Sequence, residues 1–107
     1  NLSGANLSKA NLSGFDLTEA NLSGADLNGA DLKEANLGGA NLSGADLREA
    51  DLREADLNTL LFGAANLSGA NLVKSNLTGA DLDDVKLEGA ILCHTTMPDG
   101  KENNSGC

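Results

Sequence analysis

The sequence predicts an all-β fold, a right-handed β-solenoid in which a bending chain winds into stacked turns. Three observations predict it. Leu recurs every five residues from Leu2 to Leu92, and Phe62 is the only exception. This central position is called i, and the residue at i−2 is Ala in fourteen of eighteen repeats. Nine of the thirteen glycines occupy position i+2.

The period of five excludes the common alternatives. In an α-helix, five residues advance by about 500°, so successive Leu side chains drift by about 140° and form no apolar stripe. In a flat strand, an odd step places successive Leu side chains on opposite faces. A chain that is extended for about three residues and then bends accounts for the spacing of five. Its backbone amides find partners if successive turns of the coil hydrogen-bond to each other. Parallel crossovers are right-handed, which sets the hand of the coil.

The corners of the coil are also encoded locally. Gly at i+2 suits a turn that requires positive φ. Asn or Asp fills i−1 in nearly every repeat, departing only at Leu61, Lys86 and Ile91. A short side chain with a carbonyl oxygen can accept a hydrogen bond from the backbone of the bend, so most of these Asp residues are expected to be structural.

Charge and composition limit the function. The 107 residues carry a net charge of −9, which argues against direct binding to nucleic acid or to an anionic membrane surface. No apolar run is long enough to span a bilayer. The chain starts at Asn1, part-way through a repeat and without Met, which indicates a processed product or an excised piece.

Units such as Ala-Asn-Leu-Ser-Gly and Ala-Asp-Leu-Arg-Glu make residues 1–94 resemble the pentapeptide repeat proteins. The resemblance implies a right-handed quadrilateral parallel β-helix with four pentapeptides per turn, positions i and i−2 inside, and about five turns. We expect this helix over residues 1–97 and a tail over residues 98–107 that caps the last turn.

With twenty residues per turn, each residue lies next to the residue twenty positions later. The central residues then form four core columns: Leu2, Leu22, Leu42, Phe62, Leu82; Leu7, Leu27, Leu47, Leu67, Leu87; Leu12, Leu32, Leu52, Leu72, Leu92; and Leu17, Leu37, Leu57, Leu77, Met97. Phe15 replaces Ala at an inner position, so we expect it to close the amino-terminal end or to displace local packing.

The same spacing stacks like charges on the outside. The predicted pairs are Asp26 with Asp46, Asp31 with Asp51, and Glu34 with Glu54. Basic residues nearby offset these charges in part. The two interpretations are a solvated charged face and a surface that docks a protein partner. No catalytic, cofactor-binding or metal-binding residue is predicted here, because the carboxylates project from a convex surface without a pocket.

Leu60, Leu61 and Phe62 break the pattern together. Leu61 takes the outward position that Asn or Asp fills elsewhere. It indicates either irregular packing or a small apolar contact patch, to which Val73 or Ile91 could contribute.

Cys93 and Cys107 are the only cysteines. The count favours a disulfide that ties the tail across the last turn, with free thiols and a Cys93, His94, Cys107 metal site as the alternatives. A disulfide would require an oxidising compartment. The tail is similar to those of pentapeptide repeat proteins from cyanobacteria and the thylakoid lumen. We therefore expect an extracytoplasmic location, in the thylakoid lumen or the periplasm, with the cytoplasm as the alternative.

The sequence favours a non-enzymatic structural or protein-interaction module with an acidic surface, no cofactor and an unknown protein partner. The amino-terminal turn shows no helix or loop that could cap it. Three interpretations are open: Phe15 covers this end, further chain that is missing from the sequence covers it, or molecules associate there end to end. The alternative implied by the resemblance is a DNA mimic that binds DNA gyrase. Ice binding is not expected, because Thr18, Thr59 and Thr78 form no complete ladder.

Overall fold

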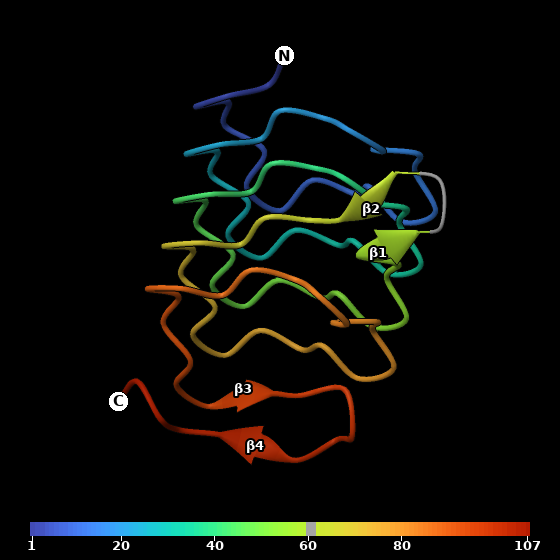
Figure 1. Cartoon of the computed structure of the whole chain (residues 1–107). Coiled ribbons are helices and arrows are strands. Elements are labelled where there is room, and N and C mark those ends of the chain that lie inside the picture. The colour runs from blue at the N-terminus through green and yellow to red at the C-terminus, as the bar shows by residue number, and fades with distance from the viewer. Residues whose placement is uncertain (60–61) are drawn as a thin grey trace.

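The protein is a right-handed quadrilateral parallel β-helix, as the sequence predicts (Figure 1). The structure is a computed structural model that describes residues 1–59 and 62–107. Each turn of four pentapeptides is a rung, and the described residues form four complete rungs and a partial fifth. Parallel bridges join position i−1 of one rung to position i−1 of the next, as between Asn21 and Asn41.

Backbone hydrogen bonds join the amides of one rung to the carbonyl oxygens of the next. The amides of Leu22 and Gly24 donate to the carbonyl oxygens of Asn41 and Ser43, at 2.8 and 2.9 Å. The amide of Ala25 turns inward to the carbonyl of Leu22 at 3.1 Å and so closes the corner. The same scheme recurs along the solenoid, as from the amides of Leu47 and Glu49 to the carbonyl oxygens of Asn71 and Val73. A chain without long strands can therefore pair most of its amides.

The corners confirm the predicted turn chemistry. Glycines at i+2 adopt positive φ, for example +67° at Gly44. The Oδ1 atom at i−1 accepts the amide of i+1, as from Ser43 to Asn41 at 3.0 Å. Eight non-glycine residues at i+2 adopt the same left-handed conformation: Lys9, Glu19, Glu34, Glu49, Glu54, Lys74, Asp84 and His94.

These non-glycine corners are strained, so glycine should stabilise them. Glu49 is exposed and has φ of 60°. The left-handed conformation costs an L-residue with a Cβ about 1–2 kcal/mol of strain. Glycine avoids this strain, but its larger loss of backbone entropy on folding costs about 0.5–1 kcal/mol relative to Ala. We expect Glu49→Gly to raise the free energy of unfolding by up to about 1 kcal/mol in urea denaturation. Glu49→Ala keeps its Cβ and is the control; an equal gain from both variants would contradict this explanation.

The core consists of the inner Leu and Ala side chains. Leu22, Leu42 and Leu67, in the second, third and fourth rungs, are fully buried. The end rungs are less protected, and Leu2 is 39% exposed. Phe15 is 51% exposed, so it covers the amino-terminal end only in part.

The predicted register is wrong beyond residue 57. Bridges are twenty residues apart up to Asn36 and Asp56, but Asn41 pairs with Asn66, twenty-five residues later. At this point β1 (Asn58–Thr59) pairs antiparallel with β2 (Gly63–Ala64), and the two strands are the arms of a hairpin that leaves the rung (Figure 1). Phe62 therefore fills no core column and is 39% exposed. Leu60 and Leu61 lie outside the described residues.

The bridges define the corrected columns. A spacing of twenty residues resumes after the hairpin, as between Asn66 and Lys86. The corrected columns are Leu2, Leu22, Leu42, Leu67, Leu87; Leu7, Leu27, Leu47, Leu72, Leu92; Leu12, Leu32, Leu52, Leu77, Met97; and Leu17, Leu37, Leu57, Leu82.

The hairpin rests on a pair of glycines in the preceding rung. A Cβ atom at Gly38 would lie 2.5 Å from Oγ1 of Thr59, and one at Gly39 would lie 2.8 Å from the carbonyl oxygen of Phe62. The amide of Gly39 donates to the carbonyl of Gly63 at 3.1 Å. Only residues without a Cβ allow the hairpin to approach this closely.

Replacing Gly39 should therefore loosen the hairpin. Gly39 and Gly44 share a φ of 67°, but a Cβ at Gly44 would meet nothing within 4 Å. Gly44→Ala should cost the left-handed strain alone, about 1–2 kcal/mol. Gly39→Ala should cost about 1–3 kcal/mol more, because the new methyl group overlaps backbone. Equal losses in urea denaturation would show that the hairpin does not rest on Gly39.

The carboxyl-terminal tail turns back along the last rung. Strand β3 (Thr95–Thr96) bridges to Asn76 above it and pairs antiparallel with β4 (Glu102–Asn103). Thr95 is buried, and its hydroxyl donates to the carbonyl of Leu72 at 2.6 Å. The amide of Gly106 donates to the carbonyl of Leu92 at 2.7 Å. The tail is therefore hydrogen-bonded to the solenoid at both of its ends.

Candidate functional site

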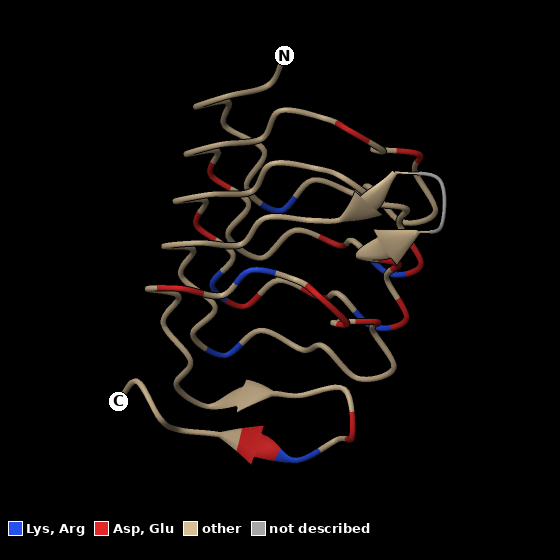
Figure 2. Ribbon diagram, viewed as in Figure 1, with Lys and Arg blue, Asp and Glu red and all other residues tan. Residues whose placement is uncertain are grey.

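The predicted charge stacks lie on neighbouring rungs. Asp26 bridges to Asp46, and Asp31 bridges to Asp51, all four side chains being partly buried. Figure 2 shows acidic and basic segments interspersed along the rungs. Each of these carboxylates also accepts the amide of its own corner, so the aspartates are structural as well as charged.

Arginines neutralise the lower carboxylate of each stack. Arg48 holds Asp46 with two hydrogen bonds, Nε to Oδ1 at 2.9 Å and Nη2 to Oδ2 at 2.6 Å. Arg53 holds Asp51 in the same way, at 2.8 and 2.6 Å. Lys33 lies 3.8 Å from Asp31. Because a bidentate pair fixes both side chains, this face is a row of ordered, alternating charges rather than a purely acidic belt.

The ion pairs with arginine depress the pKa of Asp46 and of Asp51. Hydrogen bonds from Arg48 and Arg53 hold the pKa of Asp46 and of Asp51 below the ordinary value of 3.8. A depressed pKa in the folded state means that the pairs stabilise the fold above pH 3.8 and lose this effect as pH falls through the lower, folded value.

The pairing can be tested residue by residue. In a carboxyl NMR titration, Arg48→Gln should raise the pKa of Asp46 toward 3.8, since the charge-assisted hydrogen bonds are lost. Asp51, held by Arg53, is the internal control and should titrate unchanged. An unchanged Asp46 would contradict the bidentate pair.

The remaining predicted surface residues occupy other positions. Glu34 and Glu54 are exposed at left-handed corners, twenty residues apart. Leu61 lies outside the described residues. Ile91 is 41% exposed and bridges to Asn71, whereas Val73 is partly buried.

The described part of the chain, residues 1–59 and 62–107, contains no cavity or cleft. Within the same residues, every buried side-chain nitrogen and oxygen has a hydrogen-bond partner. No helix there is long and apolar enough to cross a membrane.

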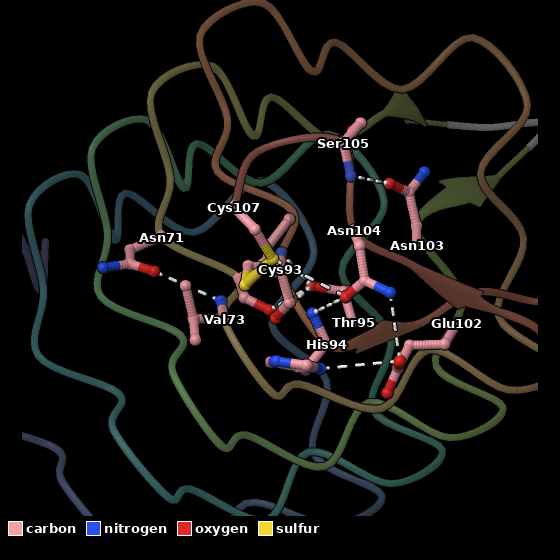
Figure 3. The surroundings of a disulfide bond; sticks show 11 residues. Asn71, Val73, Cys93, His94, Thr95, Glu102, Asn103, Asn104, Ser105 and Cys107 are labelled. Carbon is pink, nitrogen blue, oxygen red and sulfur yellow. Dashed lines mark hydrogen bonds and ion pairs between the residues drawn. A yellow bond between two sulfur atoms is a disulfide. The ribbon is translucent and has the colours of Figure 1, made fainter.

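Cys93 and Cys107 form the predicted disulfide (Figure 3). It links the last regular repeat to the tail, with 4.9 Å between the Cα atoms. Beside it, the amide of His94 donates to Oδ1 of Asn104 at 2.8 Å. Nδ1 of His94 lies 3.5 Å from Oε2 of Glu102.

Sequence reasoning missed the contribution of the tail to this cluster. Nδ2 of Asn104 donates to Oε2 of Glu102 at 3.1 Å, and this hydrogen bond, followed by that of His94, lowers the pKa of Glu102. The spacing of two between Glu102 and Asn104 follows the side-chain pattern seen at the corners. No repeat places it, so only the fold of the tail could reveal it.

The chain matches the family described as pentapeptide repeats, in eight copies, over residues 1–39, 30–58 and 62–97. A pentapeptide repeat protein from the thylakoid lumen of Arabidopsis thaliana is 34% identical to it, with a TM-score of 0.84, and the match covers 96% of this chain and 68% of the other. One from Nostoc is 42% identical, with a TM-score of 0.51, over 82% of this chain and 60% of the other.

More distant matches add no functional argument. QnrB1, a plasmid-mediated fluoroquinolone resistance protein, is 22% identical with a TM-score of 0.30, over 88% of this chain and 59% of the other. No curated protein matches the chain. The repeat match alone covers most of the sequence, and the stacked rungs carry it, so this chain belongs to the pentapeptide repeat family.

Proposed function

We propose that this chain is a non-enzymatic protein-interaction module that docks a partner through its charged face. This surface, hereafter the ladder face, spans two neighbouring sides of the solenoid and comprises Asp26, Asp31, Glu34, Asp46, Asp51 and Glu54. The observation that carries the proposal is its order: carboxylates on adjacent rungs are fixed by their corners and by bidentate arginines. Pentapeptide repeat proteins generally act as structural or interaction modules, which agrees with this proposal.

The chemistry of the ladder face suggests the kind of partner. Arg48 and Arg53 offset their own aspartates, whereas Glu34 and Glu54 are exposed, and no salt bridge to either is found in the described residues. A protein surface with exposed Lys or Arg would complement these two glutamates. Such rim charges set orientation and association rate more than affinity.

We also propose an extracytoplasmic location, in the thylakoid lumen or a periplasm. Two observations support it. The Cys93–Cys107 disulfide suits an oxidising compartment. The similar Arabidopsis protein is a protein of the thylakoid lumen. Leu61, with Ile91 and Val73, remains a candidate for a small apolar contact.

A charge-reversal pair tests the docking proposal. A photo-crosslinking group at position 33, beside Glu34, would capture partners in lumenal or periplasmic extracts and leave both glutamates in place. The same capture would then be repeated in competition with Glu34→Lys/Glu54→Lys protein and with Asp83→Lys/Asp84→Lys protein, whose altered residues are also exposed and outside the ladder face. Only the second protein should compete as well as the wild type. Equal competition by both would reject the ladder face.

The DNA-mimic alternative has less support. The net charge of −9 favours it, but two of the stacked carboxylates are occupied by arginines, whereas the phosphates of DNA are free. The purified protein at micromolar concentration should leave gyrase supercoiling unchanged. Inhibition that Glu34→Lys/Glu54→Lys removes would favour mimicry instead.

We further propose that two copies associate through their amino-terminal rungs. Leu2 and Phe15 are 39% and 51% exposed there, whereas the tail lies along the last rung at the other end. Two-fold contact between like ends therefore fits better than head-to-tail stacking. Sedimentation should give a dimer that Phe15→Asp dissociates, and a monomer at all concentrations would reject this proposal.

A further inference from the structure

The disulfide and its neighbour His94 form a group of metal-binding atoms. The two Sγ atoms of Cys93 and Cys107 and a ring nitrogen of His94 all lie within 4.8 Å of one another. Tetrahedral Zn²⁺, with Zn–S near 2.3 Å and Zn–N near 2.0 Å, places such atoms about 3.4–3.8 Å apart. The ring nitrogen needs to move by about 1 Å, and the sulfur atoms need to separate once their bond is broken.

The tail holds these residues together without the disulfide. Strand β4 pairs with β3, and the amide of Gly106 donates to the carbonyl of Leu92 at 2.7 Å. Cys107 follows Gly106 directly, and Cys93 follows Leu92. Cleavage of the sulfur–sulfur bond therefore leaves two thiols on a backbone that these hydrogen bonds still hold near the last rung, although the tail opens more often than in the oxidised chain.

The imidazole of His94 is oriented as in many metal sites. Nδ1 faces Oε2 of Glu102 at 3.5 Å, and Asn104 fixes both residues, donating to Glu102 at 3.1 Å and accepting the amide of His94 at 2.8 Å (Figure 3). A carboxylate on one imidazole nitrogen fixes the tautomer and directs the other nitrogen to the metal. Glu102 and Asn104 therefore supply the outer support that a histidine ligand requires.

We propose that reduction of this disulfide converts the tail into a zinc site, in which the thiolates of Cys93 and Cys107 and the Nε2 atom of His94 bind one Zn²⁺ and water fills the fourth position. A dithiol reductant supplies the two electrons and two protons that break the sulfur–sulfur bond, and becomes a disulfide itself. Zinc binding then releases the two thiol protons. In the oxidised chain the sulfur atoms are bonded to each other and bind no zinc. The disulfide and the zinc ion are therefore alternative crosslinks between the tail and the last rung.

Co²⁺ is the spectroscopic probe for this site. Full-length protein is reduced, separated from reductant without oxygen, and titrated with Co²⁺ and then Zn²⁺. We expect one Co²⁺ per chain, with the visible bands of a tetrahedral site and thiolate charge transfer, displaced by one Zn²⁺. Oxidised protein should show neither signal. Circular dichroism of the reduced, metal-free protein checks that the solenoid is intact.

Three variants separate this site from adventitious thiolate binding. His94→Asn suits the left-handed corner and removes one ligand, so its Zn²⁺ affinity should fall more than that of Glu102→Gln. Glu102→Gln removes only the outer carboxylate and should bind Zn²⁺ about 10–100-fold more weakly than the wild type. Glu88→Gln is an exposed control on another repeat and should bind like the wild type.

Three results would overturn the proposal. They are an affinity of His94→Asn equal to that of the wild type, one metal shared by two chains, and the same binding by oxidised protein. The first result would mean that the two thiols alone bind the metal. The second would mean that the metal bridges the tails of two chains, and the third that it binds at another site.

Discussion

Replacing Leu42 with alanine is expected to lower the free energy of unfolding by about 2–5 kcal/mol. Leu42 is fully buried in the third rung, and its column continues through Leu22 and Leu67, which are also fully buried. The cavity would sit where rungs pack on both sides, so little relaxation can close it. Urea denaturation followed by circular dichroism measures the loss.

Leu2→Ala is the matched control. It lies in the same column and removes the same atoms, but Leu2 is 39% exposed in the first rung. The expected loss is well below that of Leu42→Ala. Equal losses would mean that stability does not depend on depth in the column.

The Cys93→Ser/Cys107→Ser protein should lose about 3 kcal/mol of local stability in its tail, since a disulfide across about fifteen residues restricts the unfolded chain by that amount. The loss belongs to the last rung, because each rung contacts only its neighbours. Hydrogen exchange should therefore quicken at the amides of Gly106 and Met97, which donate to Leu92 and Lys101.

The amide of Leu42, in the third rung, is the internal control and should exchange at an unchanged rate. Reduction of the wild type should reproduce the effect, and reoxidation should reverse it. Uniform quickening along the chain would show that the tail stabilises the whole solenoid. No change at Gly106 would show that its hydrogen bond holds the tail unaided.

Most of the fold follows from the sequence because the residues of each pentapeptide determine its own core positions and its own corner. Leu at i and Ala at i−2 set the inside, and Asn or Asp at i−1 sets the corner, as the hydrogen bond from Ser43 to Asn41 shows. The break in register could not be found in this way, because five inserted residues keep the period. Two local signs mark the break: Leu60, Leu61 and Phe62 depart from the pattern, and Gly38 and Gly39 form a double glycine. Only the long-range contact with Thr59 gives the double glycine its meaning.

The surface was less predictable than the core. Stacking of Asp26 on Asp46 follows from the period, but the two hydrogen bonds of Arg48 to Asp46 depend on a side-chain conformation. The group around the disulfide depends on a tail without repeats. Spacing predicts neighbours along a column, whereas side-chain partners across a corner or a tail require the full structure.

The hairpin of β1 and β2 shows how the period of five residues tolerates an insertion. An insertion of five residues, or of any multiple of five, preserves inside and outside for all that follows, just as three nucleotides preserve a codon frame. Because the hairpin leaves the rung, it takes up no side of the square, so Asp56 meets Asp81, twenty-five residues later, and not Asn76. An insertion that leaves the rung thus changes the spacing in sequence between stacked residues, while the downstream repeats stack as they would without it.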